Sequence, residues 1–239
     1  MTTQATQRAD HTARLAGLLY LILIPIGFVG TVYIPENLVV SEDIATTIQN
    51  IVAAESQFRL SIASLFLMNI IMIAKVLLLY KLFKTVGKTM ATFMVAFLLS
   101  AAAISMLNEV NYMAVLALSH ADTEAVFSVA QIQYLITLFL NMREFGSYIA
   151  AIFWGLWLFP LGYLLLKADS RLPKFIGVTL IIAGFSYVFD SFVFFLAPHF
   201  FMSIVDYTYF GEVVFGFWLL IRGANIEPWK WRKSALAPA

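Results

Sequence analysis

Six apolar stretches, each about 20 residues long or longer, constrain this chain more than any other feature of its sequence. A helix needs about 20 mainly apolar residues to cross ~30 Å of hydrocarbon. The stretches are residues 15–34, 60–83, 89–118, 145–166, 175–197 and 204–221. They predict an all-α polytopic membrane protein with six transmembrane helices. Residues 14–223 then form a single transmembrane domain between two tails, residues 1–13 and 224–239.

The composition also favours a lipid environment. Of the 239 residues, 62% are hydrophobic and 12% are charged, and the mean hydropathy is +0.87. A soluble domain carries about 25% charged residues, so this chain has too little polar material to cover a globule in water. The net charge of +1 argues against a nucleic-acid partner. Because there is no cysteine, a disulfide, a thiolate metal site and a cysteine nucleophile are excluded.

The basic residues predict the orientation in the membrane. If the N-terminus is cytoplasmic, twelve of the fifteen lysines and arginines fall on the cytoplasmic side of the six spans. Positive charge is retained on that side of a membrane, so the prediction is a plasma (inner) membrane protein with both termini in the cytoplasm. The outer loops keep only Arg59 and Arg143. No cleavage pattern follows the first apolar run, which therefore reads as an uncleaved span.

Two amphipathic helices are predicted on the outer side. Within residues 41–59, Ile44, Ile48 and Ile51 mark one face, and Ser41 is a candidate N-cap. Residues 125–142 are uncharged but rich in amides, and a seventh span here would place the next basic cluster outside. This segment is read either as a helix on the outer surface or as an extension of the fourth span.

Ionisable side chains inside the predicted spans need a specific reason, because each costs ~2.5–3.5 kcal/mol even on insertion scales. They are Lys75, Glu109, Asp190 and Glu212, and polar side chains at similar depth are Asn108, Asn111 and Tyr187. One interpretation is that the carboxylates converge in an outward-facing polar cleft with the lysine at its floor, which would bind a proton or a ligand. The other is a set of separate hydrogen bonds between helices.

Two charge pairs stand at the outer entrances of the second and fourth spans. They are Glu55 with Arg59, and Arg143 with Glu144. Both pairs are read first as interfacial salt bridges. The alternative is an electrostatic collar for an anionic or zwitterionic ligand.

The sequence contains no catalytic motif of the hydrolase, metalloprotease, phosphate-loop or dinucleotide-binding kind. The three histidines are scattered, so no metal site and no cofactor is predicted. Gly177 and Gly184 lie seven residues apart on one helix face, a spacing typical of close helix packing.

Four segments together resemble a prokaryotic family of multi-pass membrane proteins known as domain of unknown function forty-three eighty-six. They are ARLAGLLYL, ESQFRLSI, FWGLWLFPLGYLL and RLPKFIGVTLIIAGFSYVFDS, in this order along the chain. The resemblance implies a helical bundle in a prokaryotic plasma membrane, with no established activity. Glu55, Arg59 and Asp190 fall inside the matching segments. Trp157 stands where many relatives are expected to have a histidine.

Three functional hypotheses follow from these observations. The first is binding or transport of a small molecule or lipid through an outward-facing polar cleft lined by the buried carboxylates. The second is a non-catalytic membrane partner or sensor protein. The third is an intramembrane enzyme acting on a lipid or isoprenoid, which requires two or more carboxylates side by side. The partners that the sequence indicates are the lipid bilayer and a small-molecule or lipid ligand. It does not indicate the oligomeric state.

Overall fold

The computed structural model describes residues 3–40, 42–120, 126–170, 173–197, 199, 202–223 and 226–227. The chain is almost entirely helical over these residues, which confirms the predicted all-α class. The helices in chain order are α1 (Thr3–Phe28), η1 (Val29–Tyr33, a π-helix), α2 (Ile34–Leu38), α3 (Ile44–Ala53), α4 (Glu55–Phe83), α5 (Lys88–Asn108), α6 (Val110–Leu118), α7 (Val129–Leu156), α8 (Leu158–Lys167), α9 (Lys174–Leu196), α10 (Val205–Thr208) and α11 (Phe210–Arg222). Two short strands, β1 (Asp169–Ser170) and β2 (Ile226–Glu227), pair antiparallel.

Five helical stretches in the described part of the chain are long and apolar enough to cross a membrane. They are Ala9–Leu38, Glu55–Phe83, Lys88–Leu118, Val129–Lys167 and Lys174–Leu196. The predicted sixth span, residues 204–221, is not among them. Its helix is interrupted at Tyr209, and the 13 residues of α11 rise only ~20 Å at 1.5 Å per residue. The structure therefore supports five helices of spanning length and one shorter helix.

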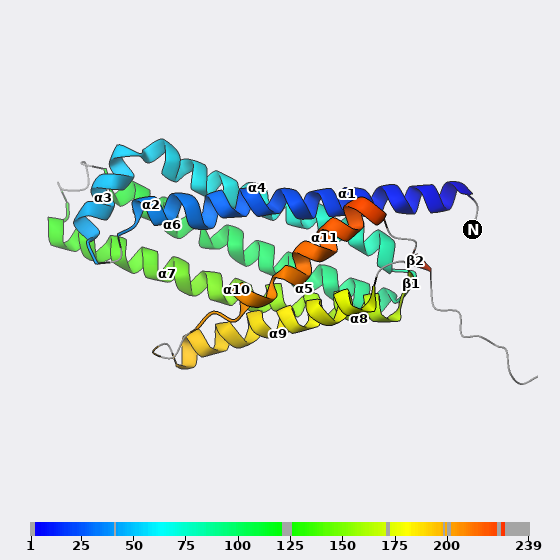
Figure 1. The fold of residues 1–239 in the computed structure, drawn as a ribbon. Coiled ribbons are helices and arrows are strands. Elements are labelled where there is room, and N and C mark those ends of the chain that lie inside the picture. Colours follow the sequence, from blue (N-terminus) through cyan, green and yellow to red (C-terminus); the bar gives the residue numbers. More distant parts are fainter. Residues whose placement is uncertain are drawn as a thin grey trace, which may run out of the picture.

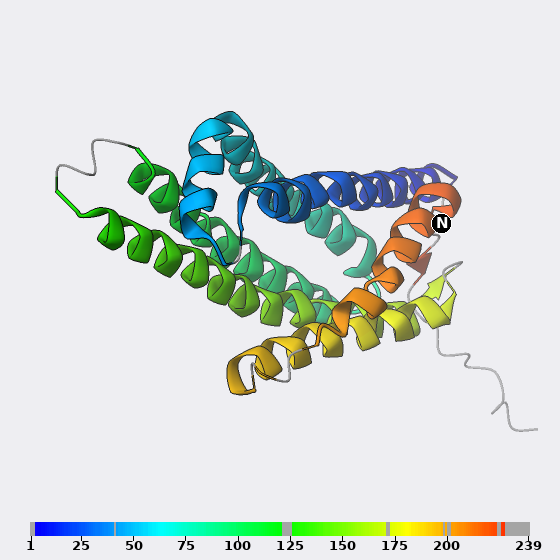
Figure 2. The ribbon, with the colours of Figure 1, turned by 60° about the vertical axis from the view of Figure 1, so that its left-hand side comes forward.

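The helices form a ring in which most neighbours follow one another in the sequence, and α11 meets α1 (Figure 1). Going around the ring, α1 packs against α4, α4 against α5, α5 against α7 and α8, these against α9, and α9 against α11. The short α11 slants from α9 back to α1 and closes the ring. The start of α1 and the β1–β2 pair lie together at one end, called here the terminal end (Figure 2). The opposite end, called the α3 end, carries α2, α3 and α6.

The bundle has two separate hydrophobic cores. The core of the terminal half is built by α1, α4, α5, α8, α9 and α11, with Trp157 as its largest fully buried side chain. The core of the α3 half is built by α2, α3, α4, α6 and α7 around Phe58 and Tyr112. Because α11 is short, it contributes only to the first core.

Glycines bring α9 into close contact with α7 and α8. A Cβ atom added at Gly162 would lie 2.6 Å from the carbonyl oxygen of Gly177. A Cβ added at Gly155 would lie 2.6 Å from the carbonyl oxygen of Gly184. Such distances leave no room for a methyl group, so the packing predicted from Gly177 and Gly184 is confirmed, and each faces another glycine.

The structure treats the two predicted amphipathic helices differently: one is a separate helix, and the other is part of the long helix α7. Residues 44–53 form α3, but Asp43 caps it by accepting a hydrogen bond from the Thr46 backbone N–H at 2.9 Å. The expected N-cap, Ser41, lies outside the described residues. The second segment begins at Ser128, which forms a capping box with Gln131, and continues unbroken through α7. Of the two alternatives for residues 125–142, the extension of the fourth span is therefore observed from Val129 onward.

The cap of α3 gives a testable pH dependence. Hydrogen bonds from Thr46 lower the pKa of Asp43 below its ordinary value of 3.8. The ionised carboxylate therefore stabilises α3 above pH 3.8, and this contribution is lost as the pH falls through the lowered pKa. We expect hydrogen-exchange protection of the α3 amides, corrected for intrinsic rates, to decrease in this acid range. Asp43→Asn retains a capping oxygen without the charge, so an equal acid-induced loss in that variant would contradict the assignment.

Candidate functional site

Arg143 is the centre of a polar group at the α3 end, where α5, α6 and α7 meet. Its Nη2 lies 3.5 Å from Oε1 of Glu109, which is 4% exposed and sits at the break between α5 and α6. The Arg143 guanidinium carbon lies 4.0 Å from the centre of the Tyr112 ring. Because the ring covers one face of the guanidinium and the carboxylate bonds one edge, the side chain is fixed in place.

Asn108 ties this group to the backbone of α7. Its Nδ2 donates hydrogen bonds to the carbonyl oxygen of Arg143 at 2.7 Å and to Oγ of Ser147 at 3.3 Å. Its Oδ1 accepts from Nδ2 of Asn111 at 3.0 Å. The amide also overlaps the position that a Cβ of Gly146 would occupy, so glycine is needed there. Asn108 therefore positions α7, and Asn111 holds Asn108 in place.

Two buried polar atoms of the Arg143–Glu109 pair remain without a partner. Among the described residues, neither Nε of Arg143 nor Oε2 of Glu109 has a hydrogen-bond partner. A buried donor or acceptor left unpaired costs about 1–3 kcal/mol. The pair therefore carries one unmet donor and one unmet acceptor within the contact between α5, α6 and α7.

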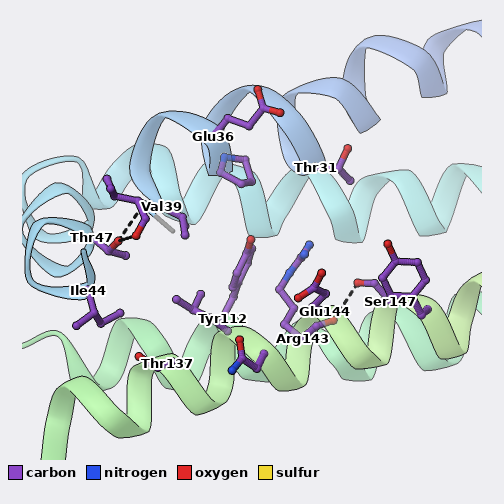
Figure 3. A pocket seen from close by; sticks show the side chains of 15 residues that line it. Thr31, Glu36, Val39, Ile44, Thr47, Tyr112, Thr137, Arg143, Glu144 and Ser147 are labelled. Carbon is purple, nitrogen blue, oxygen red and sulfur yellow. Dashed lines mark hydrogen bonds between the residues drawn. The ribbon is translucent and has the colours of Figure 1, made fainter. Parts of the chain in front are cut away.

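A cavity of about 600 Å³ opens beside this pair, between η1 and α2 on one wall and α7 on the other (Figure 3). Arg143, Glu144, Ser147 and Tyr148 line it from α7, and Tyr112 lines it from α6. The view shows Arg143 and Tyr112 rising from the α6–α7 side toward the opposite wall. The volume is within the range of ligand pockets, about 300–1,000 Å³.

A π-helix contributes to one wall of the cavity, and the sequence did not predict it. Residues 29–33 form η1 between α1 and α2, and Thr31 from this segment lines the cavity. π-helical insertions are rare and occur frequently at functional sites. Pro25 lies one turn earlier and removes a backbone donor from the same helix.

Lys75 lies in a different place, in the core of the terminal half. Its side chain is 1% exposed. Its Nζ lies 3.7 Å from the centre of the Tyr20 ring and 4.5 Å from that of Trp157. Tyr20 in turn donates a hydrogen bond from its hydroxyl to Oε2 of Glu212 at 3.2 Å. The lysine is therefore held between two aromatic faces, with the carboxylate linked to it through Tyr20 and by electrostatic attraction.

Tyr187 belongs to the same group, because it packs against the terminal core and interacts electrostatically with Glu212. Lys75 has no ion pair within 4.0 Å in the part of the chain that the structure describes. The expectation that Lys75 points to a carboxylate is thus only partly met. The aromatic rings are its direct contacts, and Glu212 lies beyond one of them.

Asp190 has a third set of partners. It is 3% exposed, and its Oδ2 accepts hydrogen bonds from the backbone N–H groups of Ile204 and Val205, both at 2.8 Å. These amides belong to the unpaired donors at the start of α10. Asp190 therefore anchors the chain that returns from α9 to α10.

The described contacts contradict the prediction that the buried carboxylates share a single cleft. Glu109 contacts Arg143, Asp190 contacts the start of α10, and Glu212 contacts Tyr20. Neither Lys75 nor Glu212 lines the cavity beside Arg143. The physical reason is that each carboxylate satisfies itself with the nearest donor on a neighbouring helix. The second interpretation, separate interhelical contacts, describes these residues better.

Of the two charge pairs predicted at the helix entrances, one is observed and the other is not. Nε of Arg59 lies 2.6 Å from Oε1 of Glu55, and both side chains are partly exposed, as predicted for an interfacial salt bridge. Arg143 pairs with Glu109 instead of Glu144, so that pairing was wrong. Residues next to each other on a helix point in different directions, which leaves Glu144 free to line the cavity.

Sequence reasoning missed Tyr20, Trp157 and Ser147. An aromatic residue is a common core residue in a membrane helix, so nothing in the sequence marked Tyr20 or Trp157 as partners of a lysine. The prediction of no metal site is untested, and the described residues contain no group of three or more histidine, aspartate or glutamate side chains arranged for one.

The Tyr20 hydroxyl gives a further prediction. Tyr20→Phe keeps the ring over Lys75 but removes the donor to Glu212, which leaves a buried oxygen unpaired. We expect the free energy of unfolding to fall by about 1–2 kcal/mol, measured by SDS titration in mixed micelles. Tyr163→Phe, at an exposed tyrosine, is the matched control and should leave stability unchanged. Equal stability of both variants would show that the bond to Glu212 contributes nothing.

Five apolar helices of membrane-spanning length, with charged side chains buried between them, define a membrane-embedded helical bundle. The sequence model of the family described as Domain of unknown function (DUF4386) matches residues 15–223, and the chain belongs to this family. It is also 31% identical over 167 residues to an uncharacterized protein of Archaeoglobus fulgidus, covering 70% of this chain and 86% of that protein. No solved structure matches the chain. The resemblance found in the sequence is confirmed, and the family carries no assigned activity.

Proposed function

We propose that this protein binds an amphipathic small molecule or lipid in the cavity beside Arg143, at the outer face of the plasma (inner) membrane. In this proposal both termini are cytoplasmic, because the basic residues gather at the terminal end. Lys81, Lys84, Lys88 and Lys167 flank the helix ends there, as the rule of cytoplasmic positive charge requires.

The observation that carries the proposal is that the partly exposed Arg143 side chain lines a ligand-sized cavity, with its guanidinium held by Glu109 and Tyr112. A planar guanidinium presents several donors in a fixed geometry that matches phosphate or carboxylate oxygens. Glu109 and Tyr112 hold this guanidinium in one orientation before a ligand arrives. A preorganised donor loses little freedom on binding, so its contribution to affinity is large.

The contacts favour binding over catalysis. An intramembrane enzyme of the kind considered requires carboxylates side by side, and Glu109, Asp190 and Glu212 have three different sets of partners. Whether binding is part of a transport cycle depends on a pathway through the terminal core, which is filled by apolar side chains in this conformation.

The test uses dodecylphosphocholine as the probe and dodecyl maltoside as its uncharged counterpart. Native mass spectrometry of the purified protein should show a retained phosphocholine adduct and no maltoside adduct. The double variant Glu109→Gln/Arg143→Gln removes the guanidinium without leaving a buried carboxylate, and we expect adduct occupancy to fall at least tenfold. Arg222→Gln, at an exposed arginine of the terminal end, should retain the adduct. Unchanged occupancy in the double variant would refute the proposal.

A further inference from the structure

The depth of the cavity, its charges and its open side together define the ligand more narrowly. We infer that the cavity receives the headgroup of a zwitterionic phospholipid, which enters sideways from the outer leaflet. This inference rests on the proposed function and adds the class of ligand and its route.

The depth follows from the length of the fourth span. Arg143 precedes Lys167 by 24 residues, and α7 and α8 run on in one direction between them. At 1.5 Å per residue this is ~36 Å, whereas the hydrocarbon is ~30 Å thick. With Lys167 at the cytoplasmic surface, Arg143 lies just beyond the hydrocarbon on the other side. That level is occupied by lipid headgroups.

The charges around the cavity favour a ligand that carries both signs. Arg143 is the one basic residue among the described lining residues, and Glu144 and Glu36 are the acidic ones. Glu109 already faces Arg143 from behind. An anion alone would therefore meet more carboxylates than guanidinium groups and be repelled. A zwitterion presents a phosphate to the guanidinium of Arg143 and an ammonium to Glu144, so both signs are matched.

The open side is a consequence of the short α11. In the terminal half, α11 closes the ring between α9 and α1. In the α3 half, α2 packs against α4, α3 and η1, whereas α7 packs against α5, α6, α9 and α3. At the α3 end of the cavity, α3 contacts α7. Thr31 and Thr137, one on each wall, are exposed, so the cavity is open at these two residues.

Apolar side chains flank the lining residues on both walls. On α7, Leu138, Met142 and Phe145 are exposed, and each is a sequence neighbour of a lining residue. On the other wall, Tyr33 from η1 is exposed. At the depth derived for Arg143, Phe145 lies at the edge of the hydrocarbon, whereas Leu138 and Met142 lie farther out at headgroup level. A bound lipid therefore keeps its chains in the bilayer beside Phe145 while its headgroup enters the cavity. A water-soluble zwitterion has no acyl chains, so it would gain nothing from these apolar side chains.

The experiment embeds the wild-type protein in nanodiscs that contain phosphatidylethanolamine and phosphatidylglycerol with identical chains at equal amounts. Native mass spectrometry of the released protein should show phosphatidylethanolamine enriched at least fivefold among the retained lipids. Glu36→Gln/Glu144→Gln should bring the retained ratio close to that of the nanodisc. Glu42→Gln, an exposed acid at the same end that does not line the cavity, should keep the enrichment.

The possible results separate the inference from the proposed function. Equal retention of both lipids by the wild type, with both lost in Glu109→Gln/Arg143→Gln, would overturn the zwitterion inference and leave the Arg143 site standing. Displacement of the lipid by soluble glycerophosphoethanolamine at matched concentration would overturn the sideways entry of a lipid. Retention of neither lipid together with no dodecylphosphocholine adduct would overturn both proposals.

Discussion

Arg143→Met is expected to lower the free energy of unfolding by about 3 kcal/mol, the largest effect of any single substitution considered. The change leaves Glu109 buried without its cation, and breaking a buried pair on one side costs about 3–5 kcal/mol. Glu109 is 4% exposed, so water cannot replace the lost partner. Unfolding by SDS titration in mixed micelles gives the value.

The control for this prediction is the removal of both partners. Glu109→Gln/Arg143→Met leaves no uncompensated charge and should recover most of the loss, since a neutral pair of similar volume is often tolerated. A double variant as unstable as Arg143→Met alone would mean that the arginine stabilises the fold mainly through Tyr112 and not through Glu109.

Gly155→Ala is the second substitution with a large expected effect. The added Cβ would lie 2.6 Å from the Gly184 carbonyl oxygen and 2.8 Å from Cγ2 of Val188, so α7 and α9 must move apart. Overpacking of this kind costs about 1–3 kcal/mol, even though alanine favours a helix over glycine by about 1 kcal/mol. We expect a lower midpoint of thermal unfolding in detergent.

Gly27→Ala is its matched control. A Cβ there meets only Sδ of Met68, at 3.3 Å, and a methionine side chain adjusts easily. This variant should be as stable as the wild type or more stable. If Gly155→Ala and Gly27→Ala behaved alike, the close glycine contact between α7 and α9 would be refuted.

The sequence predicted the scaffold well because the relevant signals are local. Apolar length identified the five long helices, and the seven-residue glycine spacing identified the contact face of α9. The prediction of the sixth span was wrong for a reason that apolar content alone cannot indicate. A break at Tyr209 divides residues 204–221, and the chain before it is fixed by Asp190.

The site was harder to predict because its partners are distant in sequence. Glu109 and Arg143 are 34 residues apart, and the sequence offered Glu144 as the nearer carboxylate. Lys75 was expected at the floor of a carboxylate-lined cleft, but its observed contact with Tyr20 depends on how α1 packs against α4. The π-helical turn that contributes Thr31 to one wall of the cavity has no signal in composition or hydropathy.

The most direct test of the central claim is a cryo-electron microscopy map of the wild-type protein in nanodiscs of phosphatidylethanolamine. We expect headgroup density between Arg143 and the wall formed by η1 and α2, with its phosphate at the guanidinium of Arg143 and its acyl chains leaving between α2 and α7. A cavity that holds only water, with every ordered lipid on the outside of the bundle, would contradict it.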